Sequence, residues 1–373
     1  MFNGDFCVGG LKEEEGNKNQ EDEDEGEENK KQKRTKGVGA ISIYEIERDD
    51  EEKEFKFNLI QEFEPKHREG VTSIIQLNKF YLASSSNDST IIIWSKNVQQ
   101  NNAYLACQVL LNHKSYVINL VNLSRLVLNV TSSTKKIMPK DDEMSFASCS
   151  DDNTIIVWSS MNYFQRNYKE IFLSKQVLNL HANSVICMLV MNELSELITG
   201  DSNGTLIIWS YSHLRKEFNQ QRPKQALNTN VWVTCLCLCN NKTNNTDNND
   251  NKVKVFASGH SNGAIRIWSK PNGEHLYSLH FSIENCHSNY IDSIIYLSKV
   301  NHLITTCYEE YKINIFNLNL NFKEEEEGEE KKVEKYKLKQ FLQHERVYTL
   351  IGMSNDVLMS GGGDENLKIW QAI

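Results

Sequence analysis

Apolar and polar positions repeat along this chain in a unit of eleven residues. The unit at 148–158 opens with a hydroxyl residue, passes through a polar turn, and ends in an aliphatic run closed by Trp158. The same shape returns at 84–94, 199–209, 258–268, 306–316 and 360–370. Aliphatic flanks around Asn, Asp, Gly and Ser are typical of two strands joined by a tight turn, so each unit predicts a β-hairpin.

A histidine stands upstream of most of these hairpins. The histidine precedes an apolar residue by four positions in four pairs: His67 and Val71, His113 and Val117, His181 and Val185, and His287 and Ile291. In a fifth pair, His344 precedes Val347 by three positions. Self-similarity at this scale indicates tandem repeats, which build one quasi-symmetric domain from neighbouring units.

These residues resemble the WD-repeat β-propeller family, in which each repeat forms a four-stranded blade around a central channel. The resemblance implies a hydrogen-bonded set of His, Ser or Thr, Asp and Trp in each blade. Three sets are complete: His67, Ser84, Asp88 and Trp94; His113, Ser148, Asp152 and Trp158; and His344, Ser360, Asp364 and Trp370.

Three repeats depart from the family pattern. The repeat with His181, Thr199 and Trp209 has Asn203 in place of the Asp. The repeat with Ser258 has Asn262 in the turn and Thr229 where the His would be. The repeat with His287 and Thr306 has Glu310 in place of the Asp and Phe316 in place of the Trp. We expect these blades to be less rigid, because an incomplete buried polar network orders its surroundings less than a satisfied one.

The resemblance implies an all-β propeller of four-stranded antiparallel blades, formed by residues 1–373 as a single domain. Asp5–Gly10 and Gly39–Tyr44 resemble the strands of a seventh, degenerate repeat, with Phe55–Phe63 as its outer strand. Two strands are missing at the chain ends, so we favour seven blades with incomplete ring closure. The alternative is six blades, with Phe55–Phe63 completing the last one.

Polar and charged insertions interrupt the repeats. Residues 11–36 are predicted to form a disordered charged loop, because they contain too little apolar surface to order themselves. Residues 129–145, 240–252 and 323–335 are predicted polar loops. Residues 11–36, 45–54 and 323–335 carry charges of −3, −5 and −3 out of −9 in total, which leaves the propeller body almost neutral. A near-neutral body does not favour nucleic acid as a partner.

Composition points to a protein of a reducing compartment. Hydrophobic residues make up 39% of the chain, and no apolar run is long enough for a membrane span. The first residues lack the features of a signal peptide, and nine cysteines at irregular spacings do not predict a disulfide framework. We therefore expect a cytoplasmic location. A nuclear location is the alternative, because the basic run 30–36 is similar to a nuclear localisation signal, although its acidic neighbours favour a solvated loop.

Candidate chemistry is sparse. Ser, His and Asp together suggest a hydrolase triad, but a catalytic triad occurs once, whereas these residues recur in blade after blade. Cys235, Cys237 and Cys239 alternate along one strand; zinc ligation is one interpretation, and packing between blades is the one we favour. We expect no enzymatic activity, metal or cofactor.

A candidate partner site lies at the starts of the innermost strands and in the turns beside them. It comprises aromatic, basic and acidic residues: Tyr116, Trp232, Tyr290, Tyr348, Arg346, Asp151, Asp292 and Glu309. Tyr, Trp and Arg are enriched at interface hot spots, and the acids suit a peptide that carries Lys or Arg. The alternative is that some of these rings pack into the channel wall.

The predicted function is a non-catalytic scaffold or adaptor that binds a peptide segment of a partner at the propeller mouth, within a complex. The alternative is a substrate-recognition or regulatory subunit of a multiprotein enzyme complex, such as a ubiquitin ligase. A propeller hydrolase or oxidoreductase would need a cluster of acids, His or metal ligands not shared by the repeats, and the sequence offers none.

Overall fold

The computed structural model describes residues 5–12, 38–48, 55–64, 66–128, 144–160, 171–239, 253–271, 274–320, 336–344, 346–354, 357–362 and 366–371. By their contacts these residues divide into two compact units. Unit 1 comprises those within Met1–Ser124, Met138–Asp152 and Ile156–Val177. Unit 2 comprises those within Arg125–Ile137, Asn153–Ile155 and Leu178–Ile373.

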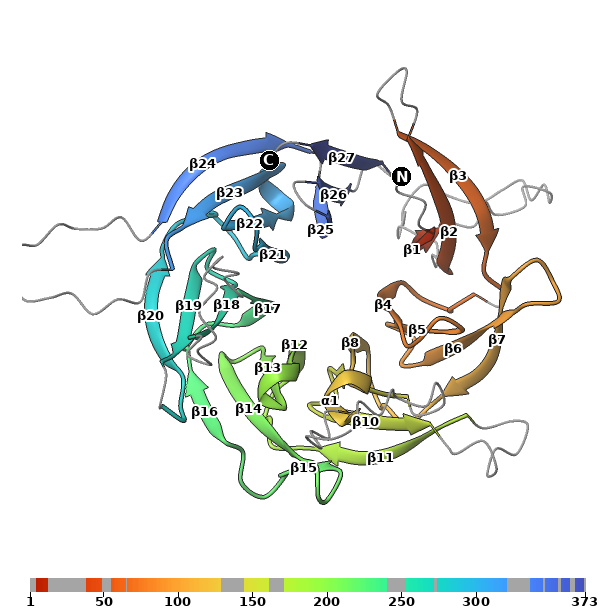
Figure 1. Cartoon of the computed structure of the whole chain (residues 1–373), viewed down its shortest axis with the longest axis horizontal. Coiled ribbons are helices and arrows are strands. Elements are labelled where there is room, and N and C mark those ends of the chain that lie inside the picture. The colour runs from red at the N-terminus through yellow and green to blue at the C-terminus, as the bar shows by residue number, and fades with distance from the viewer. Residues whose placement is uncertain are drawn as a thin grey trace, which may run out of the picture. The chain divides into compact units, whose positions relative to one another are not determined.

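The first three sheets, numbered in chain order, belong mainly to unit 1 (Figure 1). Sheet 1 contains β1 (Asp5–Lys12), β2 (Val38–Arg48) and β3 (Phe55–Glu62). Sheet 2 contains β4 (Val71–Gln76), β5 (Tyr81–Ser86), β6 (Ile91–Asn97) and β7 (Ala103–Leu110). Sheet 3 contains β8 (Val117–Asn122), β9 (Ser145–Ser150), β10 (Ile155–Ser160) and β11 (Phe172–Leu178), with the short helix α1 (Ser124–Leu128) after β8.

The other four sheets lie in unit 2. Sheet 4 contains β12 (Val185–Met191), β13 (Glu196–Asp201), β14 (Thr205–Ser212), β15 (Glu217–Phe218) and β16 (Gln225–Asn228). Sheet 5 contains β17 (Val233–Leu238), β18 (Lys254–His260), β19 (Ile265–Lys270) and β20 (Ser278–Ile283). Sheet 6 contains β21 (Ser293–Leu297), β22 (His302–Cys307), β23 (Lys312–Leu318) and β24 (Tyr336–Gln343); sheet 7 contains β25 (Val347–Ser354), β26 (Val357–Gly362) and β27 (Leu367–Gln371). Two 3-10 turns, η2 (Asn192–Leu194) and η3 (Tyr308–Glu310), follow β12 and β22.

The predicted all-β propeller of small antiparallel sheets is confirmed. Among the described residues, five sheets have at least four strands, and the first and last have three each and are not joined into one sheet. The predicted degenerate repeat forms sheet 1, where β1 pairs with β2 from Asp5–Glu45 to Lys12–Val38. The predicted outer strand is β3, which pairs with β2 from Arg48–Phe55 to Ser42–Glu62.

Most of the predicted insertions lie outside the described residues. Residues 240–252 and 323–335 do so entirely, while the predicted loops 11–36 and 129–145 overlap the end of β1 and the start of β9. The helices of the described residues are too short or too polar to span a bilayer.

Each unit is packed in the same way. First strands of successive sheets contact one another: β1, β4 and β8 in unit 1, and β12, β17, β21 and β25 in unit 2 (Figure 1). The middle strands are almost entirely buried, and their aromatic residues Trp94, Trp158 and Trp209 have exposures of 1% or less. Burying these large rings, together with the aliphatic side chains around them, contributes to the hydrophobic stabilisation of the fold.

A glutamine clamp links the outer strands of successive sheets. Gln108 of β7 donates through Nε2 to Phe172 O at 2.8 Å and accepts from Phe172 N at 2.8 Å. Gln61 makes the equivalent pair with the backbone of Tyr104, and Gln225 with that of Tyr277. One side-chain amide thus satisfies both backbone groups of a residue on the next sheet, which ties adjacent sheets together at their rims.

Candidate functional site

The polar sets of sheets 2 and 3 have the geometry that the resemblance implies. His67 lies 2.8 Å from Ser84 Oγ through Nε2 and 3.2 Å from Asp88 Oδ2 through Nδ1. Trp94 Nε1 donates to the same hydroxyl at 2.9 Å. Sheet 3 repeats the arrangement. His113 lies 2.7 Å from Ser148 Oγ through Nε2 and 2.9 Å from Asp152 Oδ2 through Nδ1. Trp158 Nε1 donates to the Ser148 hydroxyl at 2.9 Å.

Sheet 4 corrects an expectation from the sequence. Asn203 does not replace the aspartate, because Asp201 at the end of β13 reaches His181 Nδ1 at 2.9 Å. His181 Nε2 lies 2.7 Å from Thr199 Oγ1, which also accepts from Trp209 Nε1 at 3.0 Å. The set of sheet 4 is therefore complete, and the lower rigidity expected for it has no structural basis.

Sheet 6 corrects a second expectation. The hydroxyl that contacts His287 Nε2, at 2.9 Å, belongs to Thr305, whereas the Thr306 hydroxyl is buried without a partner. Thr305 pairs with Asn314 in the hairpin, and Phe316 pairs with Leu303, so the turn through η3 is one residue longer than in sheets 2 and 3. Counting back ten residues from the aromatic ring therefore selects the wrong threonine.

Sheets 5 and 7 complete the comparison. In sheet 5 the imidazole comes from His260, at the end of β18, whose Nε2 lies 2.9 Å from Ser258 Oγ. Trp268 Nε1 donates to that hydroxyl at 2.8 Å. In sheet 7, His344 Nδ1 and Trp370 Nε1 lie 2.7 and 2.8 Å from Ser360 Oγ. Asp364 lies outside the described residues.

Hydrogen bonding keeps Asp88 and Glu310 of these sets ionised. Burial alone raises the pKa of Asp88, but hydrogen bonds from His67, Thr90 and the Arg68 backbone outweigh it, so the pKa falls well below its usual range. For Glu310, burial is likewise outweighed by hydrogen bonds with Ser288 and His287, which lower the pKa to about 2. A carboxylate that accepts several hydrogen bonds is stabilised in its charged form.

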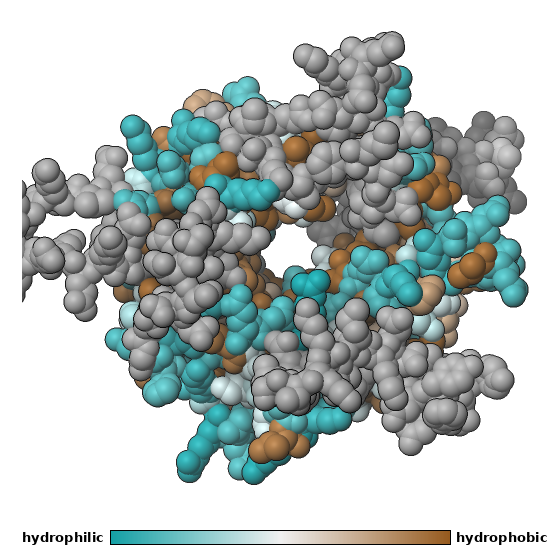
Figure 2. Space-filling view, in the orientation of Figure 1, coloured by the Kyte–Doolittle hydropathy of each residue, from teal (hydrophilic) through white to brown (hydrophobic). Residues whose placement is uncertain are grey.

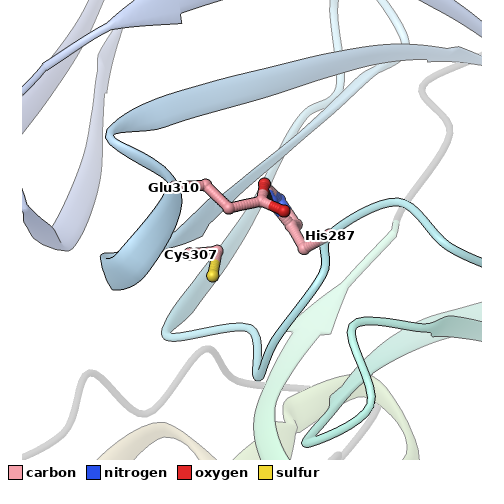
Figure 3. A group of neighbouring side chains, drawn as sticks. All are labelled: His287, Cys307 and Glu310. Atoms are coloured by element: carbon pink, nitrogen blue, oxygen red, sulfur yellow. Dashed lines mark hydrogen bonds and ion pairs between the residues drawn. The ribbon is translucent and has the colours of Figure 1, made fainter.

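One group of potential metal ligands occurs among the described residues. The donor atoms of His287, Cys307 and Glu310 lie within 4.8 Å of one another, and the Glu310 carboxylate points at the imidazole (Figure 3). However, His287 hydrogen-bonds through both ring nitrogens, and Lys312 Nζ lies 3.3 Å from Glu310 Oε2. Burial, and then Glu310 and Asp292, raise the pKa of Cys307 and so disfavour the thiolate that a metal requires. The three side chains therefore fit a structural polar set of sheet 6 better than they fit a metal-binding site.

The alternating cysteines of β17 join the core. Cys239 is fully buried, and Cys235 and Cys237 pack against the same cluster, which contains Ile291 and Leu303. Burial raises the pKa of Cys235 to about 12, which is the behaviour of a packed thiol rather than of a metal ligand. These contacts favour the packing interpretation.

The aromatic residues at the strand starts are exposed. Exposed fractions are 50% for Tyr116, 55% for Trp232, 37% for Tyr290 and 53% for Tyr348. Each adjoins a residue with no exposure, which anchors the strand: Val117, Val233, Ile291 and Val347. In each pair one side chain enters the core while the ring of its neighbour faces solvent. None of these four rings is buried in a wall.

In unit 1, the candidate residues Tyr116 and Asp151 lie together. The backbone N–H of Asp151 donates to Tyr116 O at 3.0 Å, and Ser115 Oγ donates to Asp151 Oδ2 at 3.0 Å. The Asp151 side chain is exposed. This pair therefore presents one ring and one carboxylate to solvent.

In unit 2, the longer turn of sheet 6 adds two tyrosines that the sequence did not single out. The rings of Tyr308 and Tyr348 lie 4.9 Å apart. Arg346 Cζ lies 5.6 Å from the Tyr308 ring, and its Nε lies 3.5 Å from Tyr311 Oη. The signal in the sequence was the pair Tyr308 and Tyr311 on either side of Glu309 and Glu310, once the extra turn residue is recognised.

Two carboxylates border these rings. Asp292 Oδ2 accepts from Tyr308 N, and Glu309 Oε2 accepts from Asn289 Nδ2. Burial, with a further contribution from Glu309, raises the pKa of Asp292 to about 6, although the Tyr308 N–H opposes the rise. Burial, and then the charges of Asp292 and Glu309, raise the pKa of Tyr290. The Tyr290 N–H donates to Asn289 Oδ1, and the amide of Asn289 is the group that donates to Glu309.

Trp232 lies on the adjoining sheet of the same unit. Its carbonyl accepts from Ser261 N at 3.2 Å, and two residues later Thr234 Oγ1 donates to Ile291 O at 2.6 Å. The start of β17 is thereby tied to the segment that carries Tyr290 and Asp292. Sheets 5, 6 and 7 together present Trp232, the tyrosines and the two acids from one unit.

Comparison with known proteins agrees with the repeats. A family model described as "WD domain, G-beta repeat" matches residues 57–95 and 129–159. The first match contains the whole polar set of sheet 2, and the second contains Ser148, Asp152 and Trp158 of sheet 3. No curated protein matches the chain.

Proposed function

Because the chain belongs to the WD-repeat family of β-propellers, a fold that generally serves as a protein-interaction scaffold, we propose that it is a non-catalytic adaptor. In this proposal the chain binds a peptide segment of a partner protein through the exposed strand-start residues of unit 2. The acidic residues among them suit a segment that carries Lys or Arg.

The observation that carries the proposal is the exposure of Trp232, Tyr290 and Tyr348 next to fully buried residues. Exposed Trp and Tyr next to residues held in the core are good anchors, because they bury large areas on binding and lose little conformational entropy. Hydrophobic residues on the face seen in Figure 2 lie in small groups between hydrophilic ones. That distribution suits recognition through a few anchors.

The polar sets support a non-catalytic role. Ser84 Oγ already accepts from Trp94 Nε1 and contacts His67, and all three residues are buried. A nucleophile needs access to its substrate and a base that is free to take its proton. The recurrence of this arrangement in successive sheets supports a structural role for it.

Affinity purification of the intact chain tests the proposal. It should be run beside the double variant Trp232→Ala, Tyr290→Ala, with captured proteins identified by mass spectrometry. A matched control, Leu214→Ala with Leu276→Ala, removes two exposed apolar side chains of unit 2. Neither residue lies at the start of the first strand of a sheet, where Trp232 and Tyr290 are found. All three proteins should unfold at similar urea concentrations, which shows that the fold is intact.

Partners that are lost only in the Trp232 and Tyr290 variant would support the adaptor. Partners that all three proteins retain would refute binding at these residues. A ligase or another enzyme among the partners lost would favour the alternative of a recognition subunit in an enzyme complex.

A further inference from the structure

The carboxylate of Asp292, immediately before β21, is a candidate contact for a cation. Asp292 is half-buried, and among the described residues no lysine or arginine forms an ion pair with it. Its Oδ2 accepts from the Tyr308 backbone, which leaves Oδ1 to the surroundings. The side chain of Glu309, the next acid, accepts from the neutral amide of Asn289, and no ion pair with it is formed within the described part of the chain. Taking a carboxylate partly out of water without a counter-ion is costly, so this position favours a cation.

The rings beside Asp292 can also receive a cation. Aromatic faces attract ammonium and guanidinium groups, most strongly when these are partly desolvated. Tyr290 lies two residues before Asp292 and is linked to Glu309 through Asn289, which accepts from Tyr290 N and donates to Glu309 Oε2. The rings of Tyr308 and Tyr348 pack against each other at 4.9 Å. The guanidinium of Arg346 already lies over Tyr308, so this cluster attracts a positive charge within the protein itself.

We infer that Tyr290, Asp292, Tyr308 and Tyr348 form a subsite for one cationic side chain, Lys or Arg, from a partner's peptide segment. This inference rests on the proposed function and names the chemistry that its site recognises. The charged end of the ligand contacts Asp292, and its aliphatic stem lies against the tyrosines. Arg346 is an internal competitor, because it occupies a face of Tyr308 and repels an incoming cation.

The backbone of Arg346 agrees with this position. Arg346 has a φ of 46°, in the left-handed region that residues with side chains seldom adopt. It precedes Val347, which is fully buried and pairs with Gly362 at the start of β25. The strained residue thus lies between the end of sheet 6 and the anchored first strand of sheet 7, where its side chain reaches Tyr308 and Tyr311.

Arrayed peptides with one fixed central residue test the subsite. The probes are random-sequence octapeptides with Arg, Lys, citrulline, norleucine or Glu at the centre, incubated with the labelled full chain. Citrulline and norleucine match the shapes of Arg and Lys without their charge. We expect the Arg and Lys arrays to bind about three- to tenfold more protein than the neutral ones, the range of one partly exposed charge contact plus a cation–π contact.

Two substitutions give opposite expectations. Asp292→Asn keeps an acceptor for the Tyr308 N–H but removes the charge, so the preference for Arg over citrulline should disappear. Arg346→Gln removes the competitor, so binding to the Arg and Lys arrays should increase by about two- to fivefold. A merely structural role for either residue would not change the charge preference.

The outcomes separate this inference from the proposed function. If the Trp232 and Tyr290 variant loses its partners while Asp292→Asn keeps them and the arrays show no charge preference, the adaptor stands and the cation subsite is wrong. Preferential binding to the Glu array, lost in Arg346→Gln, would overturn the inference by assigning the site to an anion. Partners retained by every variant would refute both.

Discussion

Thr305 Oγ1 lies 2.9 Å from His287 Nε2, whereas the hydroxyl of its neighbour Thr306 is buried with no hydrogen-bond partner. The two side chains point to opposite sides of β22, so only one of them reaches the histidine. The extra residue in the turn through η3 determines which one it is. Sheet 6 thus contains both a satisfied and an unsatisfied threonine, side by side in sequence.

Replacing these threonines with valine should have opposite effects on stability. Thr305→Val deprives His287 of its buried partner and should lower the free energy of unfolding by about 1–3 kcal/mol. Thr306→Val removes an unpaired hydroxyl without changing the shape of the side chain, so it should be neutral or stabilising by up to about 1 kcal/mol. Urea denaturation of both variants measures the difference. Equal losses in the two would show that neither hydroxyl is distinguished by its hydrogen bond.

Asp201 should be essential to sheet 4, and Asn203 dispensable. Asp201 Oδ2 contacts His181, and its Oδ1 accepts from the backbones of Asn203 and Thr205. Asp201→Ala leaves the buried His181 imidazole and two partly buried backbone N–H groups without their acceptor and should cost about 1.5–3 kcal/mol. Asn203→Ala alters an exposed side chain and should change the unfolding free energy by less than about 0.5 kcal/mol. A larger loss for Asn203→Ala than for Asp201→Ala would restore the assignment made from the sequence.

The sequence predicts the repeat, the hairpins and two full polar sets because these follow a fixed spacing. It does not predict the position eight residues before the aromatic ring, which holds Ser86, Ser150, Asp201 and His260 in sheets 2 to 5. That position looks variable, yet it is the last residue of the second strand and pairs with the valine at the start of the first strand. A side chain at this position reaches the polar set. Asp201 therefore supplies the carboxylate of the set in sheet 4, and His260 supplies the imidazole of the set in sheet 5.

The candidate partner residues were accessible to sequence reasoning for a similar reason. Trp232 and Tyr290 are exposed and directly precede the fully buried residues Val233 and Ile291, whose apolar character the repeat pattern reveals. Tyr308 and Tyr311 were missed because they lie in a turn whose length differs from that in sheets 2 and 3. Turn length is set by local backbone conformation, here by Tyr311 with a φ of 55°, and the spacing of the repeat does not reveal it.

Removing a glutamine clamp should loosen two sheets without affecting any polar set. Gln108 makes three hydrogen bonds to the backbone of Ile171 and Phe172. Gln108→Ala should lower the free energy of unfolding by about 1–3 kcal/mol, because backbone groups on the next outer strand lose their partner. Gln100→Ala, in the exposed turn before β7, is the matched control and should have no measurable effect. Amide hydrogen exchange should accelerate at Phe172 in the first variant, and unchanged exchange there would contradict the clamp.

Acidification should destabilise the fold through His260, because this imidazole is fully buried beside Arg266. Burial, followed by the charge of Arg266, lowers the pKa of His260 to about 4 from a usual value near 6.5. The unfolded chain therefore takes up a proton at a higher pH than the folded one does. The stabilisation of the folded state by neutral His260 is fully present above about pH 6.5 and is lost as the pH falls toward 4. The free energy of unfolding then falls by about 3 kcal/mol at most.

A His260→Gln variant isolates this contribution. It should be less stable at neutral pH, because Ser258 loses its imidazole partner, but its unfolding free energy should fall less between about pH 7 and about pH 4.5. Asp292 works in the opposite direction in part of this range, since its pKa is raised to about 6 and its protonated form favours the folded state. The comparison therefore uses the difference between the two proteins at each pH, measured by urea denaturation. Parallel pH profiles would show that His260 does not titrate as its burial requires.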